Sequence, residues 1–239
     1  MKRHRLLGRK KCFNRYAKGD GAFMKRLIAI GGSENDLKDL KDVFYYMFKN
    51  LPDNPKLIYI PTANNDHQAY SEYMKNFFES NYKAKVDILY LLSEKNDYLK
   101  IGERVMTANC IYVEGGNLKL LLNELNREEM KNILVDAYNG GITLAGISAG
   151  AMCWFEYGFS DNCDRTSLKK YYSIVPCMSF VKGVVSPHYN DIERKNFFKL
   201  ELKNNKLLSE GWGIENGSAL IWEDGKYSTI NNVEHLTSK

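Results

Sequence analysis

Short apolar runs alternate with longer segments of helical periodicity along most of the chain. The apolar runs have the length of buried strands and fall at 27–30, 57–60, 86–90, 110–113 and 142–145. Apolar residues recur every three or four positions in the segments between them, at 36–50, 68–81, 117–125 and 128–139. Strands that alternate with helices predict an α/β fold with a mostly parallel central sheet and helices on both faces. The later part of the chain has more strand character.

Small residues follow several of the predicted strands. These turns contain Gly31-Gly32, Pro61-Thr62, Gly115-Gly116 and Ser148. Ligand sites in open α/β sheets gather at the carboxyl ends of the strands. We therefore expect the turns at Gly116 and Ser148 to line one pocket.

The turn at 146–150 reads Gly-Ile-Ser-Ala-Gly and directly follows an apolar strand. A G-x-S-x-G turn between a strand and a helix exposes the serine hydroxyl, and this pattern predicts Ser148 as a nucleophile. The backbone N–H groups of Ala149 and Gly116 are the expected donors to an oxyanion. A glycine-rich turn without catalytic function, which many α/β proteins contain, is the alternative.

A serine nucleophile needs a base, and the chain has four histidines. His4 is in the basic N-terminal segment, His67 is in a polar loop, and His235 is close to the C-terminus. His188 follows an apolar strand and a proline, so it is the predicted base. Its alternative role is a structural one at the end of the strand.

The third member of a triad is a carboxylate that orients the histidine. Glu215 is the prediction, because it is flanked by glycines at the start of the apolar segment 219–222. Asp161 and Asp164, in the loop after the helix that follows Ser148, are the alternatives.

The composition indicates one folded domain. The chain has 239 residues, of which 44% are hydrophobic, and no apolar run approaches the roughly 20 residues of a membrane helix. Residues 24–239 are expected to form a single α/β domain. Because the basic N-terminus is not followed by the apolar stretch of a secretory signal, we expect a cytoplasmic protein without membrane contact.

The positive charge is concentrated at the N-terminus. Residues 1–23 contain eight lysines and arginines and one acidic residue, so the net charge of +5 becomes −2 for the rest of the chain. We interpret residues 1–23 as a disordered basic extension, with contact to RNA or a membrane as the alternative. A folded part with this charge balance predicts no nucleic-acid partner.

The five cysteines, at positions 12, 110, 153, 163 and 177, show no C-x-x-C spacing. The histidines and cysteines do not cluster in a metal-binding pattern, and the predicted chemistry needs neither a metal nor another cofactor. The aromatic residues at 171–172 or 197–198 could form the interface of a homo-oligomer or belong to the core, and the sequence does not decide between these.

Six short segments together carry a resemblance to a known family. They are 30–32, Ile-Gly-Gly; 60–63, Ile-Pro-Thr-Ala; 114–117, Glu-Gly-Gly-Asn; 146–151, Gly-Ile-Ser-Ala-Gly-Ala; 187–189, Pro-His-Tyr; and 213–215, Gly-Ile-Glu. From about residue 25 to residue 220 the chain resembles the dipeptidase E (aspartyl dipeptidase) family of serine peptidases, which also includes the cyanophycinases. The resemblance implies a flavodoxin-like three-layer sandwich similar to class I glutamine amidotransferases.

The resemblance also implies a mechanism. Ser148 would attack the peptide carbonyl, His188 would act as the base, Gly116 and Ala149 would bind the oxyanion, and Glu215 would match the third position of the family. The order Ser, His, Glu differs from the Ser, acid, His order of ordinary α/β-hydrolases.

The implied activity is hydrolysis of short peptides, including dipeptides with an N-terminal aspartate. Aspartate specificity requires a cation, and Lys182, Arg165 and Arg194 lie near the catalytic segments without matching a family motif. Hydrolysis of β-aspartyl peptides, as in cyanophycinases, is one alternative. A binding protein with the same fold and no catalytic activity is the other.

Overall fold

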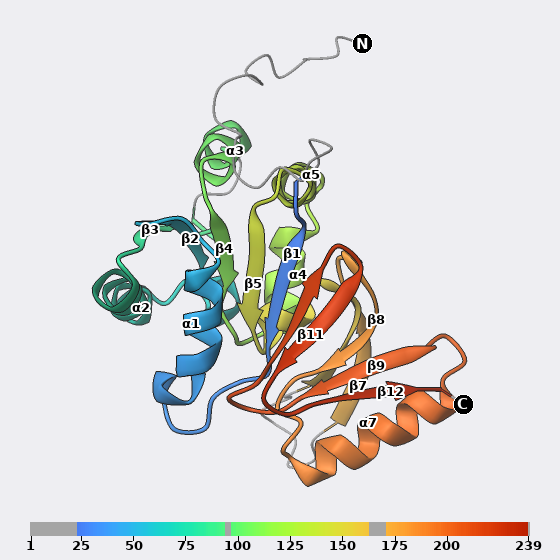
Figure 1. Ribbon diagram of the computed structural model, residues 1–239. Coiled ribbons are helices and arrows are strands. Elements are labelled where there is room, and N and C mark those ends of the chain that lie inside the picture. Colours follow the sequence, from blue (N-terminus) through green and yellow to red (C-terminus); the bar gives the residue numbers. More distant parts are fainter. Residues whose placement is uncertain (1–22, 94–96, 163–170, 239) are drawn as a thin grey trace, which may run out of the picture.

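Two β-sheets form the frame of the protein (Figure 1). The computed structural model describes residues 23–93, 97–162 and 171–238. Within this part of the chain, seven strands form the central sheet in the order β11-β10-β1-β5-β4-β2-β3. They are β1 (Arg26–Ile30), β2 (Lys56–Ile60), β3 (Lys85–Ile88), β4 (Cys110–Val113), β5 (Thr143–Ile147), β10 (Ala219–Glu223) and β11 (Lys226–Ile230).

The central sheet is parallel from β1 to β3, and β10 and β11 extend it in antiparallel pairing. Its inner strands β1, β2, β4 and β5 are buried on both faces, since both faces are covered by helices, whereas β11 at the edge is largely exposed. The helices of the protein are η1 (Leu37–Leu40), α1 (Lys41–Lys49), η2 (Thr62–Asn64), α2 (Gln68–Tyr82), α3 (Tyr98–Met106), α4 (Leu118–Leu125), α5 (Glu128–Asn139), α6 (Ala149–Met152) and α7 (Ile192–Asn204).

Alternate residues of the inner strands pack into two different hydrophobic cores. Leu27 and Ala29 of β1 belong to the core that contains the apolar faces of α3, α4 and α5. Ile28 and Ile30 belong to the core that contains those of α1 and α2. The central sheet therefore lies between two helical layers, which confirms the predicted α/β fold with a mostly parallel central sheet.

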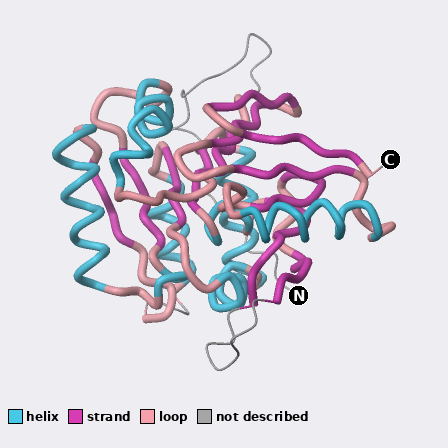
Figure 2. Tube along the Cα trace, turned by 90° about the horizontal axis from the view of Figure 1, so that it is seen from below, coloured by secondary structure: helices cyan, strands magenta, loops and turns pink. Residues whose placement is uncertain are grey.

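A second sheet was not predicted. It has the order β12-β9-β8-β6-β7 within the described residues and extends away from the central sheet together with α7 (Figure 2). Its strands are β6 (Phe155–Asn162), β7 (Tyr171–Pro176), β8 (Val181–Ser186), β9 (Glu210–Ile214) and β12 (Val233–Thr237). The helix α7 covers one face of this sheet, where Phe198 and Leu202 pack with Phe159 and Val184.

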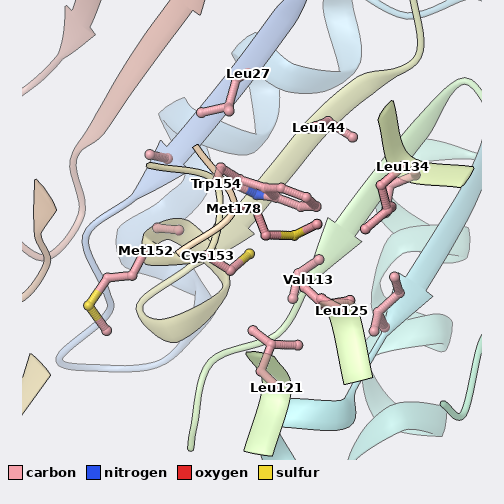
Figure 3. Packing of buried hydrophobic residues seen from close by; sticks show 14 of the residues in the cluster. Leu27, Val113, Leu121, Leu125, Leu134, Leu144, Met152, Cys153, Trp154 and Met178 are labelled. Carbon is pink, nitrogen blue, oxygen red and sulfur yellow. The ribbon is translucent and has the colours of Figure 1, made fainter. Parts of the chain in front are cut away.

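Trp154 connects the two sheets. It is fully buried directly after α6, and Figure 3 shows its indole among Leu144, Met178 and Leu134. These contacts pack the residues after α6 against β5, α5 and the segment between β7 and β8.

Two further predictions concern regions outside the sheets. The basic extension at 1–23 lies, except for its last residue, outside the described part of the chain, so its disorder stays a prediction. Among the described residues, no helix combines the length and the apolar composition needed to cross a bilayer.

Candidate active site

Ser148 lies on a sharp turn between β5 and α6. Its backbone has φ 55° and ψ −113°, a conformation that costs a non-glycine residue on the order of 1–3 kcal/mol. The turn is tight, because a Cβ atom on Gly150 would be 2.1 Å from the carbonyl oxygen of Val113. The Ser148 N–H donates to the carbonyl of Ile30 at 2.9 Å, which attaches the turn to the end of β1.

His188 is brought to the serine by the second sheet. It follows β8 and Pro187, and its N–H donates to the carbonyl of Gly31 at 3.1 Å. The Nε2 atom of His188 is 2.8 Å from the Oγ atom of Ser148. Serine and histidine, forty residues apart in sequence, are therefore both attached to the carboxyl end of β1.

The third position is occupied by Asn216. Its Oδ1 atom is 2.8 Å from Nδ1 of His188. Because an amide oxygen only accepts hydrogen bonds, the proton of neutral His188 is on Nδ1. The Nε2 atom is then free to accept the Ser148 hydroxyl proton.

The prediction of Glu215 in this position is wrong. Its Oε2 atom accepts a hydrogen bond of 3.0 Å from the Asn232 side chain. Glu215 directly follows β9, and successive side chains along an extended chain point in opposite directions. Glu215 therefore points toward the turn at Asn232, and its neighbour Asn216 points toward His188.

The alternative acid Asp161 does not take this position either. Asp161, on β6, forms an ion pair with Arg194, in which Oδ1 and Nη2 are 2.9 Å apart. Asp164 and the cation Arg165 lie outside the described residues. Lys182 forms an exposed ion pair with Glu156 at 3.3 Å.

Two of the remaining histidines are used elsewhere. The Nδ1 atom of His67 caps α2 by accepting the N–H of Tyr70 at 3.2 Å. The Nε2 atom of His235 is 3.1 Å from the carboxylate of Glu210, and its ring stacks on Trp212. His4 lies outside the described part of the chain.

The turn after β4 lies beside the serine. A Cβ atom on Gly115 would be 3.2 Å from Cβ of Ser148, and Gly116 lines the same cavity as the serine. The N–H groups of Gly116 and Ala149 have no acceptor within the described part of the chain. Gly116 lines the cavity, whereas Ala149 is buried at the start of α6.

A buried carboxylate supports this turn. The Oε1 atom of Glu114 accepts the N–H of Gly115 at 2.9 Å, and Oε2 accepts the hydroxyl of Tyr59 at 2.7 Å. Burial raises the pKa of Glu114, whereas these two hydrogen bonds lower it. The Glu114 side chain therefore holds the peptide plane between Glu114 and Gly115, one residue before Gly116.

Ser148 and His188 open into a cavity of about 1260 Å³. Asp161 of β6 and Arg194 of α7 line it, together with residues of α4. Arg194 is only 3% exposed, donates to the carbonyl of Phe159 at 2.9 Å, and lies 5.2 Å from the ring centre of Tyr172. The cavity therefore carries an ion pair between a buried arginine and a partly exposed aspartate.

The electrostatic environment keeps His188 neutral. Burial lowers the pKa of His188 below its ordinary value of 6.5, and the nearby Arg194 lowers it further. The hydrogen bond to Asn216 acts in the opposite direction and raises this pKa. A neutral imidazole is the form that can accept the proton of a serine.

Among the described residues, no group of three or more histidine, cysteine, aspartate or glutamate side chains has the arrangement of a metal site. Sequence reasoning missed Asn216 and the role of Arg194. A signal for Asn216 was present, because it is adjacent to the predicted acid and begins an Asn-Gly turn.

Comparison with known proteins identifies relatives along nearly the whole chain. The model of peptidase family S51 matches residues 27–230. The uncharacterized peptidase YgaJ of Bacillus subtilis is 30% identical over 213 residues, which cover 87% of this chain and 88% of that protein. Peptidase E of Streptomyces coelicolor is 27% identical over 164 residues, or 66% of this chain and 60% of that protein.

Solved structures of peptidases share the fold. A peptidase from an acI-B1 actinobacterium superimposes with a TM-score of 0.69 at 20% identity, over 91% of this chain and 96% of that one. A putative peptidase E from Listeria monocytogenes gives a TM-score of 0.65 at 24% identity, over 87% and 98%. Since the family model covers most of the chain and a relative reaches 30% identity, the chain belongs to peptidase family S51, as its short segments predicted.

Proposed function

We propose that this protein is a serine-type peptidase that hydrolyses short peptides through an acyl-enzyme on Ser148. The observation that carries the proposal is the 2.8 Å contact between Ser148 Oγ and His188 Nε2 on a strained turn. Such a contact between a nucleophile and an oriented base is typical of nucleophilic catalysis. Membership in a peptidase family supports the same chemistry.

In acylation, Ser148 Oγ attacks the carbonyl carbon of the scissile bond while its proton passes to His188 Nε2. The carbonyl oxygen becomes an oxyanion, which the N–H groups of Gly116 and Ala149 stabilise. The C–N bond then breaks, and the proton on Nε2 passes to the leaving amine. Asn216 holds Nδ1–H throughout, so the imidazole keeps its orientation.

Deacylation uses the same groups. Water donates a proton to Nε2 as its oxygen attacks the acyl carbon, and the same two amides stabilise the second oxyanion. When that intermediate collapses, the proton returns from Nε2 to Ser148 and the free acid leaves. The enzyme is then ready for the next substrate.

The preferred substrates in this proposal are dipeptides with a free N-terminal aspartate. Such a residue carries an ammonium group and a carboxylate on neighbouring carbon atoms. The ion pair of Asp161 and Arg194 in the cavity offers one partner of opposite charge to each. Asp161 already neutralises the charge of Arg194. A substrate that carries both an ammonium group for Asp161 and a carboxylate for Arg194 is therefore expected to bind better than one that carries a single charge.

The test is the release of amino acids from Asp-Leu, Leu-Leu and β-aspartyl-arginine by the wild type and by Ser148→Ala. We expect cleavage of Asp-Leu, with a loss of about 10⁴-fold or more in Ser148→Ala. Labelling by a fluorophosphonate should disappear in the same variant. Preferential cleavage of β-aspartyl-arginine would indicate cyanophycinase-like activity, and a folded wild type that neither labels nor cleaves would refute the proposal.

The substrate assignment has its own variants. Asp161→Asn should lower kcat/KM for Asp-Leu about tenfold, since an ionic contact to the substrate ammonium is lost. Lys182→Gln is the matched control, because Lys182 is not among the residues that line the cavity. If the wild type cleaves Asp-Leu and Leu-Leu with the same kcat/KM, aspartate specificity is excluded. The peptidase proposal is not affected by that result.

A further inference from the structure

Glu34 lies next to the histidine and its asparagine partner. Its Oε1 atom accepts a hydrogen bond of 3.4 Å from Nδ2 of Asn216. The same oxygen accepts from Nδ2 of Asn190. Ser148, His188, Asn216 and Glu34 therefore form one chain of hydrogen bonds that ends in a carboxylate.

The loop that carries Glu34 is fixed in this position. The carboxylate of Asp39 accepts the N–H groups of Glu34 and Asn35 at 3.0 and 2.9 Å. These hydrogen bonds lower the pKa of Asp39, so the acceptor is ionised at neutral pH. Further along the chain, Gly217 N–H donates to the carbonyl of Gly32 at 2.9 Å. The loops that carry Glu34 and Asn216 are therefore joined through their backbones.

Asn190 has a defined amide orientation, which sets the group that faces Glu34. Its Oδ1 atom accepts the backbone N–H of Asn216 at 3.2 Å. A backbone N–H is only a donor, so this side of the Asn190 amide must be its oxygen. The NH₂ group of Asn190 then faces Glu34 and holds the carboxylate beside Asn216.

An asparagine in the third position of a triad has a weakness that an aspartate lacks. Its amide has two different ends, and a rotated amide would present its NH₂ group to His188 Nδ1. The imidazole would then carry its proton on Nε2 and could not accept the proton of Ser148. An incorrect histidine tautomer of this kind removes most of the activity of a serine triad.

Glu34 disfavours the rotated amide. A carboxylate only accepts hydrogen bonds, so it pairs with the NH₂ group of Asn216 and repels the oxygen. We propose that Glu34 is a positioning residue, which acts through the Asn216 amide to hold His188 in the tautomer that accepts the Ser148 proton. The effect on catalysis rests on the proposed peptidase function, whereas the effect on the tautomer does not.

The first test is the variant Glu34→Gln, which keeps the size of the side chain and adds a donor. We expect kcat on the peptide that the wild type cleaves to fall about five- to tenfold with little change in KM, as a solvent-exposed charged hydrogen bond is lost. Glu193→Gln is the control, because it removes an exposed carboxylate near the start of α7. Its kcat should equal that of the wild type.

The second test needs no turnover. Nitrogen NMR on protein labelled at its histidines reports which ring nitrogen of His188 carries the proton, and His188→Ala assigns the signal. We expect the Nδ1–H form in the wild type and a measurable fraction of the Nε2–H form in Glu34→Gln. An unchanged tautomer in Glu34→Gln would overturn the proposal, even if no peptide substrate is found.

A double variant separates positioning from a general effect of charge. In Asn216→Asp, both oxygens of the new carboxylate accept from Nδ1–H, so the orientation of the group no longer matters. Adding Glu34→Gln to this variant should therefore cause no loss of kcat. An equal loss in both backgrounds would show that Glu34 acts in another way and would overturn the proposal.

Discussion

Gly32→Ala places a methyl group between the histidine and its asparagine partner. A Cβ atom at this position would be 2.4 Å from Nδ1 of His188 and 2.2 Å from Oδ1 of Asn216. Ordinary contacts of such a carbon begin near 3.4 Å, so each group must retreat by at least about 1 Å. The hydrogen bond of 2.8 Å between them cannot persist after this displacement.

The expected loss of activity follows from this displacement. A catalytic group that is misplaced by about 1 Å costs about 100-fold in rate, which corresponds to about 2.7 kcal/mol of transition-state stabilisation. The assay is kcat on the best peptide of the panel, together with the rate of fluorophosphonate labelling. Both rates depend on proton transfer from Ser148 to His188, so we expect both to fall by a similar factor.

Gly225→Ala is the matched control. Gly32 and Gly225 have φ of +152° and +84°, so alanine is strained at both positions. No atom lies within 4 Å of a Cβ at Gly225, and this variant therefore carries the backbone cost without the collision. We expect it to lose on the order of 1–3 kcal/mol of stability and to keep its kcat. A folded Gly32→Ala protein with wild-type rates would refute the assigned role of Asn216.

Four further predictions concern pH dependence and stability. Because burial lowers the pKa of His188, activity should persist below pH 6.5, and kcat/KM should fall only when the imidazole becomes protonated. In Asn216→Asp, the new carboxylate stabilises the imidazolium, so the acidic limb of the kcat/KM profile should move to higher pH; an unchanged limb would contradict the geometry. Tyr59→Phe removes a hydrogen bond of 2.7 Å from buried Glu114, and unfolding in urea should show a loss of about 1–3 kcal/mol. Gly102→Ala lies inside α3, where the nearest atoms are 3.7 Å from the new Cβ, so the urea midpoint should rise by an amount equivalent to at most about 1 kcal/mol.

Much of the central sheet could be predicted from local patterns. The buried runs at 27–30, 57–60 and 110–113 lie within strands of the central sheet, and the turn at Ser148 lies between a strand and a helix as predicted. The second sheet was missed, although β6 alternates Phe155, Tyr157 and Phe159 with polar residues and glycine; β7 shows no such alternation. In the structure β6 pairs with β7, the next strand in the chain, and with β8, and the sheet continues through β9 to β12.

The sequence alone determined the elements that carry the chemistry, because hydrophobic periodicity and glycine-rich turns act over a few residues. It placed Ser148 on its turn and selected His188 from four histidines. Only the tertiary structure decided between Glu215 and Asn216. The choice depends on which of these two successive side chains points toward His188 where the chain passes Gly32 after β9. The tertiary structure also placed Glu34 next to a residue 182 positions away in sequence. Contacts of this kind depend on the packing of loops from the two sheets, and no local pattern encodes that packing.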